Sequence, residues 1–322
     1  YQYKRMPFGL ASAAAAFQRI MHHVLKGIPR TLCFQDDILI YGLDEEEHNI
    51  TLREVLERLR LAGLTIKRGK CQIGVTSVEY LGHTISHEGI KPKLNLVEAI
   101  VEAPEPASKE ELKSFLGLSE FYSKFIKEFA SIVQPLCCLL KKNAAYDWNE
   151  ACQKAFDTIK HSIAKAPSLG KFDPSKPTFL TTDASNKVLG ATLTQRLEDG
   201  EHIVAFASRS LKGAENNYST VEREALGCYW AVRHFKFYLW GIPFTIRTDH
   251  KPLIFAFTTK GSEKTTPRIA RWMSGLVGFN YKMVFLPGSL NTIADYLSRA
   301  PIDQGHMEED GISQEMVLKI EH

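Results

Sequence analysis

KPTFLTTDAS, residues 176–185, has the pattern of a half-buried β-strand that ends in an acid. Phe179 and Thr181 alternate with Leu180 and their other neighbours, so the two sets point to opposite faces of a sheet. Asp183 comes where this strand stops. The pattern therefore predicts a carboxylate at the edge of a sheet, a place where catalytic groups are often found.

A second acid, Glu222, lies in the first turn of a helix expected over residues 218–239. Ala225, Leu226 and Tyr229 follow it by three, four and seven residues, which places Glu222 on their core-facing stripe. A charge there needs a partner. The alternative is that Ser219 and Glu222 form an S-x-x-E capping box and that Glu222 only satisfies backbone N–H groups.

Two further acids take comparable positions. Asp249 ends an alternating strand, FTIRTDH (residues 244–250), and Asp295 lies near the first turn of a last helix that Asn291 can cap. Each has a structural interpretation as well: Asp249 with His250 can form a strand-to-helix turn, and Asp295 can interact with the helix dipole.

Four carboxylates gathered without a cation would repel one another. Their hard oxygen ligands suit Mg²⁺, with Mn²⁺ as the alternative, and two such ions can activate a water and stabilise a leaving oxygen at a phosphorus. We therefore expect Asp183, Glu222, Asp249 and Asp295 to form a two-metal site.

Composition sets the broad class. The chain has 322 residues, 44% of them hydrophobic, which is enough for about two domains with real cores. A net charge of +3 is compatible with nucleic acid without requiring it. No apolar run is long enough for a membrane span. The six cysteines form no zinc pattern and no disulfide scaffold, so we expect a reducing, intracellular setting, cytoplasm or nucleus.

The first block is expected to be α/β. Residues 8–28 form an amphipathic helix, and TLCFQDDILIYG (residues 31–42) forms a hairpin whose tip carries Asp36 and Asp37. Such a tip is common in turns, but its apolar flanks favour a cavity or a cation beside it.

The middle of the chain is expected to be helical. A linker at residues 103–108 precedes FLGLSEFYSKFIKEFASIVQPLCCLLKK (residues 115–142). Its aromatic residues alternate with lysines that could track a nucleic acid, but their helical spacing favours a core. The positions concerned are Leu116, Phe121, Phe125 and Phe129, and the lysines Lys124, Lys127, Lys141 and Lys142.

The last block, residues 170–299, has the element order βββαβαβα, which fits a mixed five-stranded sheet flanked by helices. Arg268, Arg271 and Trp272 occupy a helix that Pro267 initiates. They either contact a nucleic-acid backbone or form the polar face and core anchor of that helix.

These motifs, in this order, resemble Ty3/gypsy-type retrotransposon Pol polyproteins. The resemblance covers nearly the whole chain to Arg299. Its ribonuclease H part consists of TDAS (182–185), VEREALG (221–227), IRTDH (246–250) with KPL, and LPGSLNTIADYLSR (286–299). Its reverse transcriptase part consists of KRMPFGLASAAAAFQR (4–19), CFQDDILIYG (33–42), the run from GLTIKRGKC to YLGHTIS (63–86) and SFLGLSEFYSKFIKEF (114–129).

The resemblance implies roles in the first block. Asp36 and Asp37 would approach a catalytic Mg²⁺, Gly9 would line a nucleotide pocket, and Leu81, Gly82 and His83 would position a primer. No Asp or Glu precedes Asp36 in this sequence, so the third carboxylate of a polymerase centre is absent from it. We expect a fragment whose polymerase activity is lost.

The fold we expect is α/β (α+β): a partial reverse-transcriptase palm at 1–100, a thumb/connection tether at 101–169, a ribonuclease H-like domain at 170–299 and a flexible tail at 300–322. The expected function is endonucleolytic cleavage of RNA in RNA–DNA hybrids, with hybrid and primer-template nucleic acid as partners. The alternatives are polymerase activity within a longer chain, or a catalytically idle nucleic-acid-binding remnant.

Overall fold

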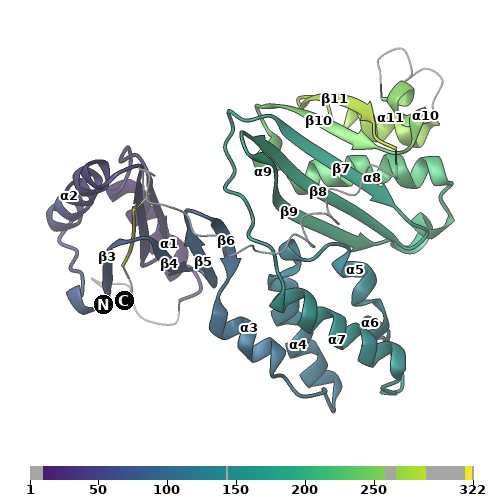
Figure 1. Ribbon diagram of the computed structural model, residues 1–322, viewed down its shortest axis with the longest axis horizontal. Coiled ribbons are helices and arrows are strands. Elements are labelled where there is room, and N and C mark those ends of the chain that lie inside the picture. The colour runs from purple at the N-terminus through teal and green to yellow at the C-terminus, as the bar shows by residue number, and fades with distance from the viewer. Residues whose placement is uncertain (1–9, 143, 258–265, 288–315, 321–322) are drawn as a thin grey trace, which may run out of the picture. The chain divides into compact units, whose positions relative to one another are not determined.

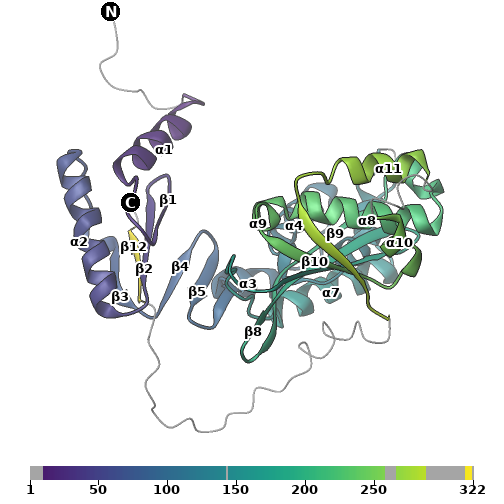
Figure 2. The ribbon, with the colours of Figure 1, turned by 90° about the horizontal axis from the view of Figure 1, so that it is seen from above.

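A computed structural model describes residues 10–142, 144–257, 266–287 and 316–320. The chain divides into two compact units, one of Tyr1–Lys93 with Gln304–His322 and the other of Leu94–Asp303. Figures 1 and 2 show the elements of each. Helix α3 (Leu94–Val101) belongs to the second unit, although the sequence analysis assigned residues up to 100 to the palm. In the described part of the chain, no helix is long and apolar enough to cross a membrane.

The first unit contains the expected helix and hairpin. Its elements are α1 (Ala13–Val24), β1 (Thr31–Phe34), β2 (Asp37–Gly42), α2 (Glu45–Leu61), η1 (Arg68–Lys70), β3 (Cys71–Val75), β4 (Ser77–Tyr80), β5 (His83–Ser86), β6 (Gly89–Pro92) and β12 (Met316–Ile320). They form one sheet of order β1-β2-β12-β3 and another of order β4-β5-β6. Strand β12 lies where a flexible tail was expected; residues 300–315 of that tail lie outside the described residues.

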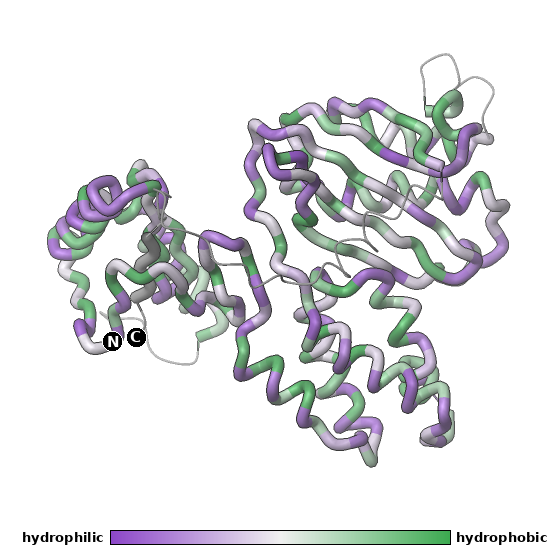
Figure 3. Tube along the Cα trace, in the orientation of Figure 1, coloured by the Kyte–Doolittle hydropathy of each residue, from purple (hydrophilic) through white to green (hydrophobic). Residues whose placement is uncertain are grey.

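Helix α2 shows why this sequence folds as it does locally. The Asp44 side chain accepts a hydrogen bond from the Glu47 N–H, and acids fill the first turn while Arg58 and Arg60 occupy the last. Both arrangements oppose the exposed partial charges of the helix ends. Hydrophilic and hydrophobic residues alternate around its turns in Figure 3, and Val55 and Leu59 on the apolar side pack against Ile38 and Ile40 of β2.

The second unit begins with short helices. They are α3, α4 (Lys109–Phe121), η2 (Ser123–Phe125), α5 (Phe129–Ile132), α6 (Gln134–Leu139) and α7 (Glu150–Ala164). The predicted core role is confirmed for Phe125 and Phe129, which are buried. It is wrong for Phe121, whose exposed fraction is 48%, and Leu116 is only half-buried. Helix α4 ends at Phe121, so the helical periodicity that linked these positions does not continue.

The rest of the unit is the predicted mixed sheet. Its elements are β7 (Thr178–Ala184), β8 (Val188–Leu197), β9 (Gly200–Ser210), η3 (Gly213–Asn217), α8 (Thr220–His234), α9 (Lys236–Leu239), β10 (Pro243–Thr248), α10 (Lys251–Ala256), α11 (Pro267–Ser274) and β11 (Asn280–Phe285). The strand order is β11-β10-β7-β8-β9, with β7, β10 and β11 parallel and β7, β8 and β9 antiparallel. Helix α8 buries Ala225, Cys228 and Ala231 against Leu180 and Leu193 of the sheet.

Candidate active site

Strands β7 and β10 deliver Asp183 and Asp249 to one edge of the sheet. They are parallel neighbours in which Thr181 lies opposite Arg247. Asp183 on β7 and Asp249 immediately after β10 each follow this pair by two residues, so they reach the same level. Thr182 points the other way and shares a hydrogen bond of 3.2 Å with the Cys228 thiol of α8. Asp183 therefore leaves the core and is exposed, as the alternating pattern predicted.

Glu224 is the acid that helix α8 brings to these aspartates. Its exposed fraction is 5%, and burial raises the pKa of its carboxyl from 4.5 to about 8, with further upward contributions from Asp183 and then Asp249. A backbone hydrogen bond at Ala184 opposes this rise. Its Oε2 atom is buried and has no hydrogen-bond partner among the described residues. A buried carboxyl with an unsatisfied oxygen is costly, which indicates that it is held for a ligand.

Glu222, which helical spacing had assigned to this cluster, instead binds Ser219 and Arg268. Its Oε2 accepts from the Ser219 N–H at 3.1 Å, and its own N–H donates to Ser219 Oγ, so the alternative capping-box interpretation describes it correctly. Its Oε1 accepts from Arg268 at 2.7 Å. The Ser219 backbone, its hydroxyl and Arg268 lower the pKa of Glu222, whereas the two aspartates raise the pKa of Glu224. We therefore replace Glu222 by Glu224 in the proposed site.

A spacing signal for Glu224 was present in the sequence. Cys228 and Ala231 follow it by four and seven residues, which is also a helical stripe, and both are fully buried. The stripe chosen from Glu222 instead ends at Tyr229, which is only half-buried. Residues 225–232 are apolar almost all round the helix, so periodicity alone could not separate the two choices.

The three gathered carboxylates are a donor set that suits a divalent cation. They offer hard oxygen atoms, they repel one another without a cation, and Glu224 Oε2 is unsatisfied. No three His, Cys, Asp or Glu side chains of the described residues are already spaced to hold a metal ion. Asp295, the fourth predicted ligand, and its capping residue Asn291 lie outside the described residues.

The cluster predicted to contact nucleic acid resolves into different roles. Arg268 binds Glu222 and lies over the Tyr218 ring at 4.2 Å. Trp272 stacks on Tyr229 and packs against the core, which supports the anchor interpretation. Arg271 is exposed on α11. Nucleic-acid contact by these three residues stays a prediction.

The first unit places Asp36 and Asp37 at a tight turn. Phe34 pairs with Asp37, which leaves Gln35 and Asp36 as a two-residue connection, with Gln35 at a φ of 54°. The Gln18 side chain of α1 holds this turn through the Gln35 N–H and the Cys33 carbonyl. Burial raises the pKa of the Cys33 thiol to about 11, and the two nearby aspartates add to it.

The second predicted polymerase motif forms another two-residue turn. Tyr80 pairs with His83, so Leu81 and Gly82 connect β4 to β5 with φ values of 47° and 76°. His83 Nδ1 lies 2.8 Å from the Leu81 carbonyl oxygen. Gly9 lies outside the described residues. The primer and nucleotide roles of these residues stay predictions.

Comparisons with known proteins match both units. Residues 1–85 match the family "Reverse transcriptase (RNA-dependent DNA polymerase)", and residues 148–246 match "RNase H-like domain found in reverse transcriptase". The chain is 37% identical over 312 residues to the Retrovirus-related Pol polyprotein from transposon 297 of Drosophila melanogaster, covering 96% of this chain and 29% of that protein. It is 35% identical over 304 residues to the Transposon Tf2-3 polyprotein of Schizosaccharomyces pombe, covering 93% and 23%. The chain thus spans less than a third of these relatives.

Solved structures show the same fold. The foamy viral protease-reverse transcriptase in complex with RNA/DNA hybrid aligns with a TM-score of 0.76 at 21% identity, covering 96% of this chain and 42% of that one. The structure of the foamy viral protease-reverse transcriptase in complex with dsDNA aligns with a TM-score of 0.75 at 22% identity. The alignment covers 89% of this chain and 60% of that one.

Proposed function

Because this chain belongs with the Pol polyproteins of Ty3/gypsy-type retrotransposons, whose reverse transcriptase and RNase H-like regions it carries, we propose that its second unit cuts the RNA strand of RNA–DNA hybrids. The observation that carries the proposal is the buried Glu224, which lies near enough to Asp183 and Asp249 for both to raise its pKa and which keeps one carboxylate oxygen unsatisfied among the described residues. Such a group of carboxylates fits phosphoryl transfer assisted by divalent cations.

Asp183, Glu224 and Asp249, with Asp295 as the fourth predicted ligand, would hold Mg²⁺ or Mn²⁺. When bound, two such cations would supply an activated water and would stabilise the leaving oxygen, so that the products would carry a 3′-hydroxyl and a 5′-phosphate. The chain's own part is to fix the ligands. Helix α8 buries Glu224 beside the sheet, and the parallel pair of β7 and β10 sets the level of the two aspartates.

Substrate choice would rest on the shape of the hybrid and on 2′-hydroxyls rather than on base sequence. A relative of this fold was solved with RNA/DNA hybrid, which supports the same class of substrate here. Within a retrotransposon, this activity would degrade the RNA template after it has been copied.

The test is cleavage of a labelled RNA–DNA hybrid by the purified chain, with Mg²⁺ or with a chelator, beside RNA-only and DNA-only duplexes. We expect metal-dependent loss of the hybrid's RNA alone, and its abolition by Asp183→Asn. Hybrid that is bound by the wild-type chain but never cut would refute the nuclease and favour an idle binding remnant.

A second candidate is polymerase activity within a longer Pol protein. It is favoured by the turn that presents Asp36 and Asp37, which Gln18 fixes from a separate helix. In such a protein, Asp37→Asn should stop primer extension on a primer-template while hybrid cleavage continues. Unchanged extension would exclude these aspartates from the polymerase centre.

A further inference from the structure

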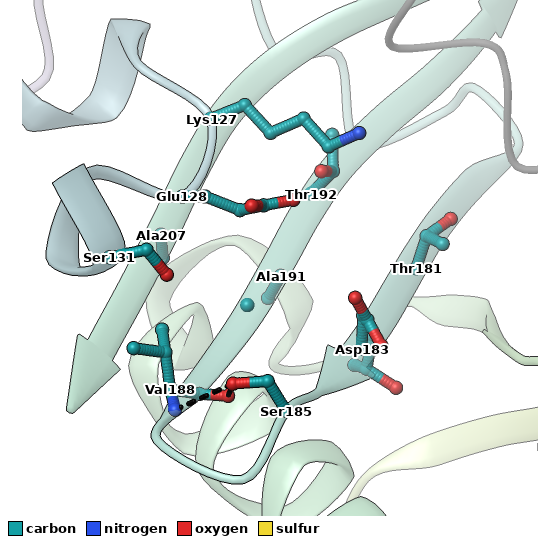
Figure 4. A pocket seen from close by; sticks show the side chains of 12 residues that line it. Lys127, Glu128, Ser131, Thr181, Asp183, Ser185, Val188, Ala191, Thr192 and Ala207 are labelled. Atoms are coloured by element: carbon teal, nitrogen blue, oxygen red, sulfur yellow. Dashed lines mark hydrogen bonds between the residues drawn. The ribbon is translucent and has the colours of Figure 1, made fainter. Parts of the chain in front are cut away.

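A cavity of about 90 Å³ lies beside Asp183 and is built by two separate parts of the second unit. Thr181, Asp183 and Thr192 line it from the sheet, and Lys127, Glu128 and Ser131 line it from the segment around α5, which precedes the nuclease fold. Figure 4 shows Lys127 and Glu128 extending toward Thr192 of β8, with Asp183 across the cavity on β7.

The segment that carries Lys127 and Glu128 is held firmly on the sheet. The Ala130 N–H donates to Ser208 Oγ of β9 at 2.9 Å, and Phe125, Ile126 and Phe129 are buried on either side of the two charged residues. The charged side chains themselves are exposed. Their backbone is therefore fixed by packing while their polar ends are available to a ligand.

The charged groups of Lys127 and Glu128 are both available to a ligand. Within the residues that the structure describes, neither the Lys127 ammonium nor the Glu128 carboxylate has a hydrogen bond or an ion pair. Glu128 also adopts a left-handed backbone with φ 55° and ψ 29°, a conformation that Gly or Asn adopts more easily. Local backbone preference therefore does not account for a glutamate at this position.

The lining chemistry identifies the class of ligand. A cavity for phosphate alone would be basic, whereas this one has two carboxylates, several hydroxyls and a single ammonium. A sugar hydroxyl both donates and accepts, so carboxylate and threonine oxygens complement it, while the lysine complements an adjoining phosphate. The 2′-hydroxyl is the group that distinguishes RNA from DNA at such a site.

We propose that this cavity binds one ribose and its adjoining phosphate on the RNA strand next to the cut. Glu128 accepts a hydrogen bond from the 2′-hydroxyl, and Lys127 contacts the phosphate. The helical segment before the nuclease fold is thereby part of the nuclease's substrate site. This inference rests on the proposed hybrid cleavage and adds two positioning residues to it.

The test compares four proteins: wild type, Lys127→Ala, Glu128→Asn and the control Lys113→Ala. Lys113 is an exposed lysine of α4 that does not line the cavity. Asn suits the left-handed backbone at residue 128, so Glu128→Asn removes the carboxylate without adding strain. Thermal unfolding checks that all four fold alike.

Cleavage kinetics then separate the two contacts. Lys127→Ala should raise KM several-fold at unchanged kcat and lower the slope of log KM against log salt by about 1. A single 2′-deoxy substitution, moved along the RNA, should slow the wild type about tenfold at one position because Glu128 is left unpaired. Glu128→Asn should lose that penalty and Lys113→Ala should keep it. Lys127→Ala matching Lys113→Ala, or no position-specific penalty in the wild type, would overturn the inference.

Fluorescence anisotropy separates this result from the proposed function. If the wild type does not cut hybrid, the proposed nuclease fails. Preference for hybrid over DNA duplex, measured in chelator, still decides the cavity's role, since Glu128→Asn should reduce it and an undiminished preference would refute the inference.

Discussion

Glutamine substitution at Glu224 and at Glu222 should have opposite effects on stability and on activity. The pKa of Glu224, raised from 4.5 to about 8, corresponds to roughly 5 kcal/mol at about 1.4 kcal/mol for each tenfold change in proton affinity. This is an upper bound for the metal-free protein, because local relaxation reduces it. The folded state binds the proton more tightly than the unfolded state does. Below pH 4.5 Glu224 is protonated in both states, and the free energy of unfolding is not reduced by its charge. As the pH rises toward 8, the unfolded state loses the proton first, so the free energy of unfolding falls.

Glutamine at position 224 carries no charge, so Glu224→Gln should remove this decrease in the free energy of unfolding at high pH. In chelator, Glu224→Gln should unfold at nearly the wild-type temperature at pH 5 and at a temperature several degrees higher at pH 8.5. Its hybrid cleavage in Mg²⁺ should fall by about 10²–10³-fold or more, the scale of losing one principal electrostatic interaction. The variant is thus expected to be more stable and inactive.

Glu222→Gln is the matched control, two residues away on the same helix. Glutamine still completes the capping box, so the variant loses only the charge that faces Arg268. Arg268 is partly exposed, and such pairs contribute at most about 1 kcal/mol. Cleavage should stay within about fivefold of wild type, the rate equivalent of that energy.

Differential scanning fluorimetry across pH and hybrid cleavage in Mg²⁺ measure both effects. The opposite pattern, an inactive Glu222→Gln beside an active Glu224→Gln, would refute the geometric assignment and restore the one made from spacing. A pH-independent difference in unfolding temperature between wild type and Glu224→Gln would refute the electrostatic reasoning.

Three further substitutions test how the two units are stabilised. Leu81→Gly should raise the stability of the first unit by about 1 kcal/mol in denaturant titration, because Leu81 has a φ of 47°; a loss would show that its side chain packs. Asp44→Ala should cost about 1 kcal/mol by removing the cap on the Glu47 N–H, and an unchanged midpoint would show that solvent replaces it. Arg247→Met should destabilise the second unit by about 3 kcal/mol, since it removes the guanidinium that binds both oxygens of the nearly buried Glu201 and leaves that carboxylate only the Thr194 hydroxyl and Arg196 at 4.0 Å. Adding Glu201→Leu should restore much of the loss.

The direction of Asp183 on the central strand β7 could be predicted because a strand has only two faces. Once Phe179 and Thr181 were assigned to one face, the direction of Asp183 followed, and the structure agrees. A helix gives no such binary choice. Helix α8 packs on the sheet, on α10 and on α11, so its apolar surface is wide, and the stripes through Glu222 and Glu224 both fit the sequence. Only the three-dimensional neighbours Asp183 and Asp249 distinguish them.

The cavity beside Asp183 could not be predicted for a different reason. Lys127 and Glu128 belong to a run of aromatic and basic residues whose local pattern indicates only a helical core with a charged surface. Their position depends on the α5–β9 contact through Ala130 and Ser208, two residues with no distinctive sequence signal and a long separation along the chain. Contacts of this kind arise from tertiary packing, which local periodicity does not encode.

The two glutamates of α8 have different roles: Glu222 stabilises the helix, and Glu224 offers an oxygen to a ligand. One residue could not do both, because its oxygens would already be bonded to protein. Both carboxylate oxygens of Glu222 are bonded to protein groups. Oε2 accepts a hydrogen bond from the Ser219 N–H in the capping box, and Oε1 accepts one from Arg268, which links α8 to α11. These bonds fix the first turn of the helix relative to its neighbours. Glu224, one half-turn further on, keeps Oε2 unsatisfied in a buried position that only a fixed helix can maintain. The hydrogen bonds of Glu222 thus fix the helix that positions Glu224. A cation bound beside Glu224 would recover the electrostatic free energy that its buried, unsatisfied carboxylate costs.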